Sequence, residues 1–382
     1  MRVLIVDDGN QRGALAAVRA LGASGAWVAV ASPHRGLSAS SRWCRRYHAA
    51  PAPSEGSAGF LDAVGSAIAV TRPDLIFPVG DAELLTLSAA RDELDTYLPY
   101  ADHAAVLTAF DKLESSKRAK AVGLHVPAVA ASTEELSDLE FPVVVKERLH
   151  GAGKSDFSIP PQPVVVAGSP EAAAAQMSEI SRSGGRALAQ TFIGGDLLAV
   201  ICLLGPKGER LAVMQQRALR TFPPGAGVST RARTERVDDE LADKVVALLR
   251  DIGWFGLAEL QFVAPPGGDP HLIDLNGRFY GSLALAVAAG ADVASTWSEA
   301  AAGGEPETVE AVVGRRYQWL EGDLRRAVTE RRGGLIADVL SCLFFAAGAR
   351  HSIWDLRDPL PGILYGSRLA ARGPAKVASR WI

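Results

Sequence analysis

Two segments of alternating polarity, separated by a turn rich in proline and glycine, lie between residues 258 and 279. Alternate side chains of a strand share one face, so this pattern predicts a β-hairpin with one apolar and one polar face. The side chains expected to face a core are Leu260, Phe262, Ile273 and Leu275. Those expected on the opposite face are Glu259, Gln261, Asp274, Asn276 and Arg278.

The polar face of this hairpin has the composition of a magnesium site. Carboxylate and amide oxygens are hard ligands, and Mg²⁺ keeps water or phosphate oxygens in its remaining positions. Arg278, on the same face, would complement the charge of a transferring phosphoryl group. The alternative is a polar face that only meets solvent, which is common in antiparallel hairpins.

A second group of candidates is basic and includes the lysines Lys112 and Lys146. Lys146 ends an apolar strand predicted over 141–146, and burying a lysine there is costly without an anionic partner. The basic segment 147–155 contains glycines, which let backbone N–H groups approach phosphate oxygens closely, and Lys154 adds charge. It lacks the first glycine of a P-loop, so a P-loop NTPase is rejected, and a surface hairpin is the alternative.

A strand predicted over 187–193 breaks at two glycines, with Asp196 just beyond them. Such a break can form a hinge that lies along a nucleotide. Its backbone would read the adenine edge, and the Asp196 carboxylate would accept hydrogen bonds from ribose hydroxyls.

The first hundred residues alternate short apolar strands with helices. This alternation indicates the α/β class, with a doubly wound parallel sheet that carries helices on both faces. Ligands of such a sheet gather at the carboxyl ends of its strands, where Asp7 and Asp81 stand. No G-x-G-x-x-G pattern follows the first strand, which disfavours a nicotinamide-dependent oxidoreductase. The predicted strands are 3–6, 26–31 and 75–78, and the predicted helices are 14–21 and 60–68.

The length of 382 residues suggests two or three domains. We expect an N-terminal α/β domain over 1–104, and linker helices with a small lid domain over 105–193. A larger α+β domain of mainly antiparallel strands, with a helix at 239–252, would span 194–305. The region 306–382 is expected to be mostly helical.

Composition and charge limit the classes of partner and the cellular location that we expect for this chain. A formal net charge of −3 gives no electrostatic reason to expect nucleic acid or a membrane. The three cysteines lack the spacing of a disulfide framework or a zinc site, and the N-terminus lacks a signal-peptide pattern, so a cytoplasmic location is expected. The apolar run 335–347 is too short to span a bilayer and is predicted to be a buried helix.

In their order and spacing, these elements resemble the ATP-grasp superfamily over roughly residues 1–305. The resemblance implies an N-terminal pre-ATP-grasp domain, followed by a lid and a larger domain that hold ATP between them. It also implies ATP and two Mg²⁺ ions as cofactors, with Mn²⁺ as the alternative metal.

The resemblance also implies roles for the nucleotide-binding residues. Lys112 and Lys146 are similar to the two nucleotide-binding lysines, and Asp196 to the ribose carboxylate. Thr191 stands where an acidic residue is common in the family. The residues similar to the phosphate-covering loop are Gly151, Gly153, Lys154 and Ser155, and those similar to the adenine hinge are Gln190, Thr191, Phe192 and Ile193.

The run DLNGRFYGS resembles the metal-binding run of the family. By this resemblance Glu259, Asp274 and Asn276 hold the magnesium ions, and Arg278 is a catalytic arginine. The chain departs from the family at Asp274, where glutamate is usual, and at Gly277, where proline is usual. Neither change removes an oxygen ligand.

The segments 216–224 and 227–231 resemble the carboxylate–amine ligase branch of the superfamily. Arg217 and Arg231 would hold an acyl phosphate or a substrate carboxylate through paired hydrogen bonds, with surface arginines as the alternative.

The branch implies an ATP-dependent ligase that activates a carboxylate as an acyl phosphate and passes it to an amine. Amino acids or small peptides are the expected substrates, and a homodimer is a reasonable expectation. Another ATP-grasp reaction, such as bicarbonate activation, and ATP binding without turnover are the alternatives.

Overall fold

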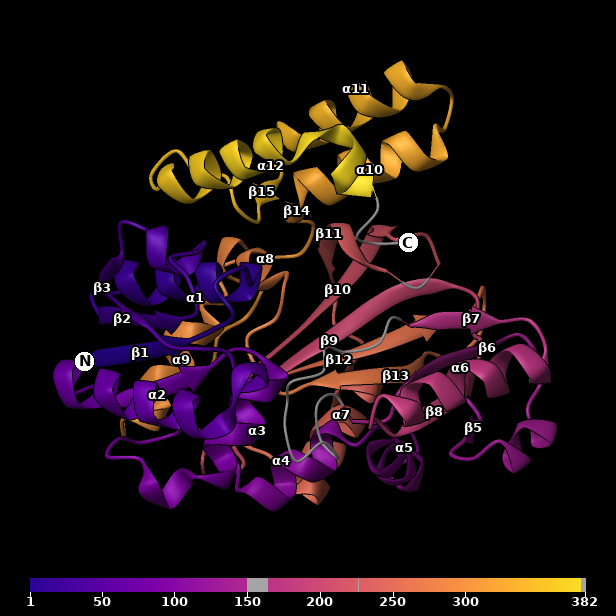
Figure 1. Ribbon diagram of the computed structural model, residues 1–382, viewed down its shortest axis with the longest axis horizontal. Coiled ribbons are helices and arrows are strands. Elements are labelled where there is room, and N and C mark those ends of the chain that lie inside the picture. The colour runs from indigo at the N-terminus through magenta and orange to yellow at the C-terminus, as the bar shows by residue number, and fades with distance from the viewer. Residues whose placement is uncertain (150–163, 226, 379–382) are drawn as a thin grey trace.

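The computed structural model describes residues 1–149, 164–225 and 227–378, with side chains up to residue 370. Its N-terminal part is a parallel four-stranded sheet in the order β3-β2-β1-β4, flanked by helices (Figure 1). The predicted α/β character of this part is confirmed. The elements are β1 (Arg2–Val6), α1 (Arg12–Ala23), β2 (Trp27–Ser32), η1 (Ser38–Ser40), β3 (Cys44–Ala49), η2 (Pro53–Glu55), α2 (Ser57–Thr71), β4 (Leu75–Pro78), α3 (Asp81–Ala89) and η3 (Arg91–Glu93).

Strand β3 was not predicted, because its sequence CRRYHA has no apolar run. It lies at the edge of the sheet, beyond β2, and none of its side chains is fully buried. An edge strand tolerates such polar residues because one side of it meets solvent.

Asp7, at the carboxyl end of β1, is buried. Its carboxylate accepts hydrogen bonds of 2.7 Å from the Ser38 hydroxyl and from the Gly9 backbone N–H. Burial nevertheless raises the pKa of Asp7 to about 7. The folded state therefore holds the proton of this carboxyl at pH values where the unfolded chain has released it.

We expect this carboxyl to make the stability of the protein depend on pH. Stability from the bound proton is fully present below about pH 4 and is lost as the pH rises to about 7. The variant Asp7→Asn lacks this titration, so its stability relative to wild type should increase by roughly 1–3 kcal/mol across that window. Urea denaturation at a series of pH values measures the difference, and parallel curves for the two proteins would contradict it.

A small antiparallel sheet follows, in the order β5-β8-β6-β7, with α6 packed against it. It has its own hydrophobic core, in which Val143 and Val145 of β6 pack with Met177 and Ile180 of α6. The elements of this region are α4 (His103–Phe110), α5 (Lys112–Ala121), β5 (Val129–Ala130), η4 (Glu134–Asp138), β6 (Val143–Glu147), β7 (Val165–Ala167), α6 (Pro170–Arg182) and β8 (Ala187–Thr191).

A larger sheet has the order β13-β12-β9-β10-β11-β14-β15. Its pairs are antiparallel from β13 to β14, as predicted for the segments after residue 196. Helix α7 spans the predicted residues Asp239–Ile252. The other elements are β9 (Asp196–Leu204), β10 (Arg210–Phe222), β11 (Val228–Glu235), β12 (Gly256–Ala264), β13 (His271–Asn276), α8 (Leu283–Ala288), α9 (Val293–Ala301), β14 (Arg316–Gln318) and β15 (Arg350–His351).

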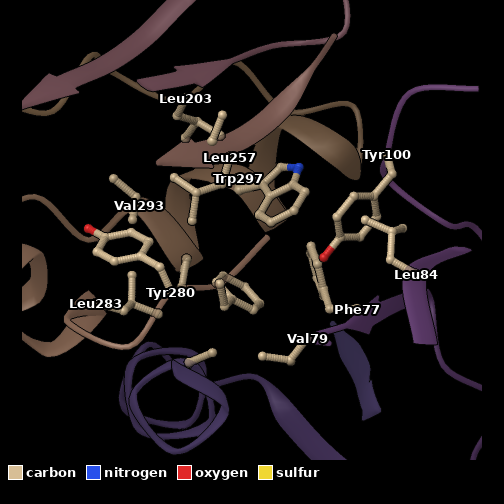
Figure 2. Packing of buried hydrophobic residues seen from close by; sticks show 14 of the residues in the cluster. Phe77, Val79, Leu84, Tyr100, Leu203, Leu257, Tyr280, Leu283, Val293 and Trp297 are labelled. Carbon is tan, nitrogen blue, oxygen red and sulfur yellow. The ribbon is translucent and has the colours of Figure 1, made fainter. Parts of the chain in front are cut away.

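The N-terminal sheet and the large sheet share one hydrophobic core. Phe77 of β4 and Tyr100 meet Trp297 of α9, with ring centroids 4.7 and 4.8 Å from it (Figure 2). Phe279, just after β13, lies 5.3 Å from Trp297 by the same measure. This packing brings the end of β13 against the carboxyl end of β4.

Three helices, α10 (Leu320–Glu330), α11 (Leu335–Ala346) and α12 (Leu360–Ala378), form a layer beyond the β10–β11 side of the large sheet (Figure 1). The helix predicted over 335–347 is present, but the prediction of its burial is wrong. The buried residues of α11 are Asp338 and Cys342, while five of its large apolar residues are exposed: Leu335, Ile336, Leu340, Leu343 and Phe344. No helix in the described part of the chain is long and apolar enough to cross a membrane.

Candidate active site

The β12–β13 hairpin has the predicted alternation. Glu259 pairs with Asn276, and Gln261 with Asp274, so their side chains share one face, while Leu260 and Leu275 are buried on the other. The prediction for Ile273 is wrong: a register shift between Gln261 and Phe262 pairs Phe262 with Leu272. Leu272 is therefore the buried residue, and Ile273 is half-buried.

Glu259 is the buried carboxylate of this face. Its Oε2 accepts hydrogen bonds from Gln261 Nε2 (3.1 Å) and Asn276 Nδ2 (3.3 Å). Burial raises the pKa of Glu259 to about 7, against the opposing effect of the Gln261 hydrogen bond. The nearby Arg278 also favours the charged form of Glu259, and a divalent cation beside the carboxylate would favour it further.

Both predicted lysines lie against β13. Lys146, at the end of β6, donates a 2.8 Å hydrogen bond to the backbone oxygen of Ile273. Lys112 Nζ lies 3.4 Å from Asp274 Oδ1. Burial lowers the pKa of Lys146 to about 8, against the attraction of Asp274. Two cations from separate parts of the chain thus converge on the polar face of the hairpin.

Local structure explains the position of Lys112. The Asp111 carboxylate caps α5 by accepting from the backbone N–H groups of Leu113 and Glu114, at 3.0 and 3.2 Å. The same carboxylate forms a 2.7 Å ion pair with Arg148, just after β6. This capping pair ties the start of α5 to the end of β6, so Lys112 and Lys146 lie near each other.

Arg278 reaches across to the N-terminal part of the chain. Its Nε bonds to Asp81, the first residue of α3, and its Nη2 donates to Asn276 Oδ1 at 3.3 Å. A small pocket at this junction is lined by Asp81, Phe110, Lys112, Asp274, Leu275 and Asn276. The candidate site therefore lies where the hairpin meets the carboxyl end of the parallel sheet.

Gln216 of β10 lies on the same face as Glu259, but the sequence alone did not predict it as a site residue. It is buried, and its Nε2 donates to Ser282 Oγ (2.7 Å) and approaches Glu259 Oε1 (3.4 Å). Its Oε1 has no hydrogen-bond partner among the described residues. The signal that would have found Gln216 is strand pairing, because Ala199 of β9 pairs with both Gln216 and Gln261.

The structure does not bring Arg217 to the hairpin cluster. Gln216 faces Glu259, so Arg217, the next residue of the strand, points to the opposite side of the sheet. There its guanidinium forms ion pairs of 2.9 Å with Glu235 and 3.2 Å with Asp196.

Arg231 is also engaged elsewhere. Its Nε forms a 2.6 Å ion pair with Asp323 of α10, and its guanidinium lies 4.8 Å from the centre of the Phe345 ring of α11. Arg231 thus holds the C-terminal helices to β11, and the expected contact with an acyl phosphate is not supported by this position.

The predicted hinge joins the small sheet to the large one. Gln190 is buried in β8, where it pairs with Val129 and Val144. The Thr191 hydroxyl is buried with no hydrogen-bond partner among the described residues. Phe192 and Ile193 are half-buried, and the exposed Asp196 begins β9.

Gly195 explains the break in the hinge. Its φ is +148°, and a Cβ atom there would lie 2.1 Å from the backbone oxygen of Ala264 in β12. A side chain is therefore excluded where the chain crosses to the larger sheet. The expected loop residues Gly151, Gly153, Lys154 and Ser155 lie outside the described residues.

The oxygen donors of the hairpin suit magnesium. Within the described ranges, no three histidine, cysteine, aspartate or glutamate side chains gather in a group that could hold a metal. The hairpin instead offers two carboxylates and one amide, Glu259, Asp274 and Asn276. Magnesium in nucleotide-dependent enzymes is commonly held by one or two carboxylates together with substrate phosphates, so this smaller set fits it.

Comparisons with known proteins agree with the resemblance. Residues 109–282 match the family model of the ATP-grasp domain. These residues are therefore an ATP-grasp domain, as the resemblance predicted for this part of the chain. Among curated proteins, no match to the chain was found.

Solved structures share the fold over most of the chain. Biotin carboxylase from Campylobacter jejuni has a TM-score of 0.63 at 14% identity, covering 82% of this chain and 74% of its own. L-amino acid ligase from Bacillus licheniformis has a TM-score of 0.62 at 15% identity, covering 79% and 74%. N5-carboxyaminoimidazole synthetase from Staphylococcus aureus has a TM-score of 0.62 at 12% identity, covering 82% and 80%.

Proposed function

We propose that this protein is an ATP-dependent carboxylate–amine ligase that works through an acyl phosphate. The observation that carries the proposal is the convergence of Lys112, Lys146 and Arg278 on the polar hairpin face. Buried charges gathered from distant segments are costly to the fold unless they have excellent partners. A magnesium-bound polyphosphate is such a partner, because its oxygens attract the cations and its metal attracts the carboxylates.

In this proposal Glu259, Asp274 and Asn276 hold the metal ions, which bridge and neutralise phosphate oxygens when bound. Lys112 and Lys146 bind phosphate oxygens. The backbone between Gln190 and Ile193 forms hydrogen bonds with the edge of the adenine ring. The Asp196 carboxylate accepts hydrogen bonds from the ribose hydroxyls in place of its ion pair with Arg217. The loop residues Gly151, Gly153, Lys154 and Ser155 cover the phosphates.

The chemistry has two steps. An oxygen of the substrate carboxylate attacks the γ-phosphorus of ATP, the bond to the β-phosphate oxygen breaks, and ADP leaves. Arg278 and Lys146 offset the charge that develops on the transferring phosphoryl group. An amine nitrogen then attacks the acyl carbon, phosphate leaves with the bonding electrons, and the nitrogen loses a proton to give the amide.

The substrates of this proposal are small acids and amines, with amino acids or small peptides first among them. The L-amino acid ligase that shares the fold favours this class, and the biotin carboxylase that shares it favours a carboxylation reaction as the alternative. Arg217 and Arg231 are given no part in the transfer step, because Arg217 pairs with Glu235 and Arg231 with Asp323, and neither carboxylate belongs to the hairpin face.

The test is ADP release from Mg²⁺-ATP in the presence of pooled amino acids, small carboxylic acids and bicarbonate, followed by mass spectrometry. A product with the mass of acid plus amine minus water, formed in step with ADP, is the expected result. A carboxylated product would identify the carboxylase reaction instead. ATP binding without ADP release from any pool would reject the ligase in favour of a nucleotide-binding protein.

A further inference from the structure

Helix α11 carries an apolar face that no part of the described chain covers. Its five exposed large apolar residues define what we call the α11 face. Ile336 and Phe344 are each 76% exposed, values close to those of an unfolded chain. Exposed apolar residues gathered on one side of a helix mark an interaction surface. The α11 face consists of Leu335, Ile336, Leu340, Leu343 and Phe344.

The outward direction of this face is held in place by buried charges. Asp338, on the inner side of α11, bonds to Arg220 of β10. Cys342, one turn further on, accepts contacts from Arg220 and from Arg231 Nη2 at 3.7 and 3.4 Å. Rotating the helix to bury its apolar side would break the contacts of Asp338 and Cys342 with the buried arginines and offer no equivalent partner. These contacts therefore keep the α11 face in solvent.

The charge of the surrounding region differs from that of the whole chain. Residues 306–382 contain twelve lysine and arginine residues against eight aspartate and glutamate residues, a net +4, within a chain of −3. Of those acidic residues, Asp323, Asp338 and Asp358 are buried in ion pairs with arginines from outside the region. Fewer acidic residues of this region are therefore exposed than the sequence count alone gives.

Exposed arginines also lie in the segment that leads into α11. Arg331 and Arg332 are both exposed, and Arg332 forms a 2.8 Å ion pair with Glu330. An apolar helix face beside basic residues is the combination that binds the interface of an anionic bilayer, through apolar burial and attraction to lipid headgroups. A second copy of the chain would instead bring like charges together across a two-fold axis.

We propose that the α11 face docks on the surface of an anionic lipid bilayer. The helix lies along the interface, with Ile336 and Phe344 in the acyl boundary and Arg331 at the headgroups. A helix of 12 residues is about 18 Å long, well short of the roughly 30 Å of a bilayer core, so it does not span. α11 lies in the layer beyond the large sheet, at the outer edge of the molecule (Figure 1).

The test is co-sedimentation of the full chain with vesicles. We expect binding to vesicles of phosphatidylcholine with phosphatidylglycerol, and much weaker binding to phosphatidylcholine alone or at high salt. The double variant Ile336→Ser/Phe344→Ser should lower the bound fraction at least about tenfold. The matched control is Val70→Ser/Val313→Ser, which removes exposed apolar residues elsewhere (51% and 58% exposed) and should bind as wild type.

Thermal unfolding of each variant establishes that the fold is kept, and the single variant Leu340→Ser replaces the double variant if it does not fold. Equal binding by the α11 variants and wild type would overturn the proposal, as would the absence of binding to either vesicle. A concentration-dependent dimer that Ile336→Ser/Phe344→Ser makes monomeric, without lipid binding, would assign the α11 face to self-association instead.

Discussion

Replacing Glu259 with alanine is expected to reduce ATP-dependent product formation at least about a hundredfold, to the level of the assay background. Glu259 is the buried carboxylate of the hairpin and lies beside Asn276 and Asp274. Its removal takes one acceptor from the amides of Gln261 and Asn276, so a modest loss of stability is expected beside the loss of activity. ADP release and thermal unfolding, measured on the same preparation, separate loss of chemistry from loss of structure.

Asn276→Ala should have an effect of the same size, because the Asn276 amide donates a hydrogen bond to Glu259 and accepts one from Arg278. The matched control is Asp269→Ala, which removes a carboxylate of the same hairpin that is 74% exposed in the turn. The control should retain wild-type turnover. Turnover retained in both Glu259→Ala and Asn276→Ala would reject the metal assignment.

The second large effect concerns stability. Asp323→Ala is expected to lower the free energy of unfolding by about 3–5 kcal/mol, because it leaves two buried guanidinium groups without their shared carboxylate. Asp323 is fully buried, and its oxygens accept from Arg220 at 3.1 Å and from Arg231 at 2.6 Å. Denaturant unfolding followed by circular dichroism measures the change.

Glu307→Ala is the control for this variant, because it removes an exposed carboxylate from the same C-terminal region. Its effect should stay within about 0.5 kcal/mol. A similarly small effect of Asp323→Ala would show that the arginine pairs do not hold the C-terminal helices, and Arg231 would again be a candidate for substrate binding.

Local periodicity accounts for what could be predicted. The hairpin that carries Glu259 and Asn276 was recognisable because alternation with a period of two depends only on neighbours in the chain. Helix α7 was also predicted with its observed bounds, Asp239–Ile252. The ATP-grasp resemblance followed from such local segments in their order.

Other features depended on packing between distant segments. Strand β3 has no apolar run and forms because β2 offers an edge. The shift at Gln261, which exchanges Leu272 for Ile273 in the core, is a property of the paired strands. Neither can be detected from one segment, because a bulge and an edge strand are defined by the partner strand.

The sequence by itself determined the resemblance to the ATP-grasp domain and the residues of the polar hairpin face, because both depend on local patterns of polarity and spacing. The tertiary structure alone decided which basic residues meet that face. It brings Lys112 and Lys146 to β13, turns Arg217 to the far side of the sheet, and joins Arg231 to the C-terminal helices. A guanidinium pairs with whichever carboxylate the fold places beside it, and that choice is made by packing between segments far apart in the chain.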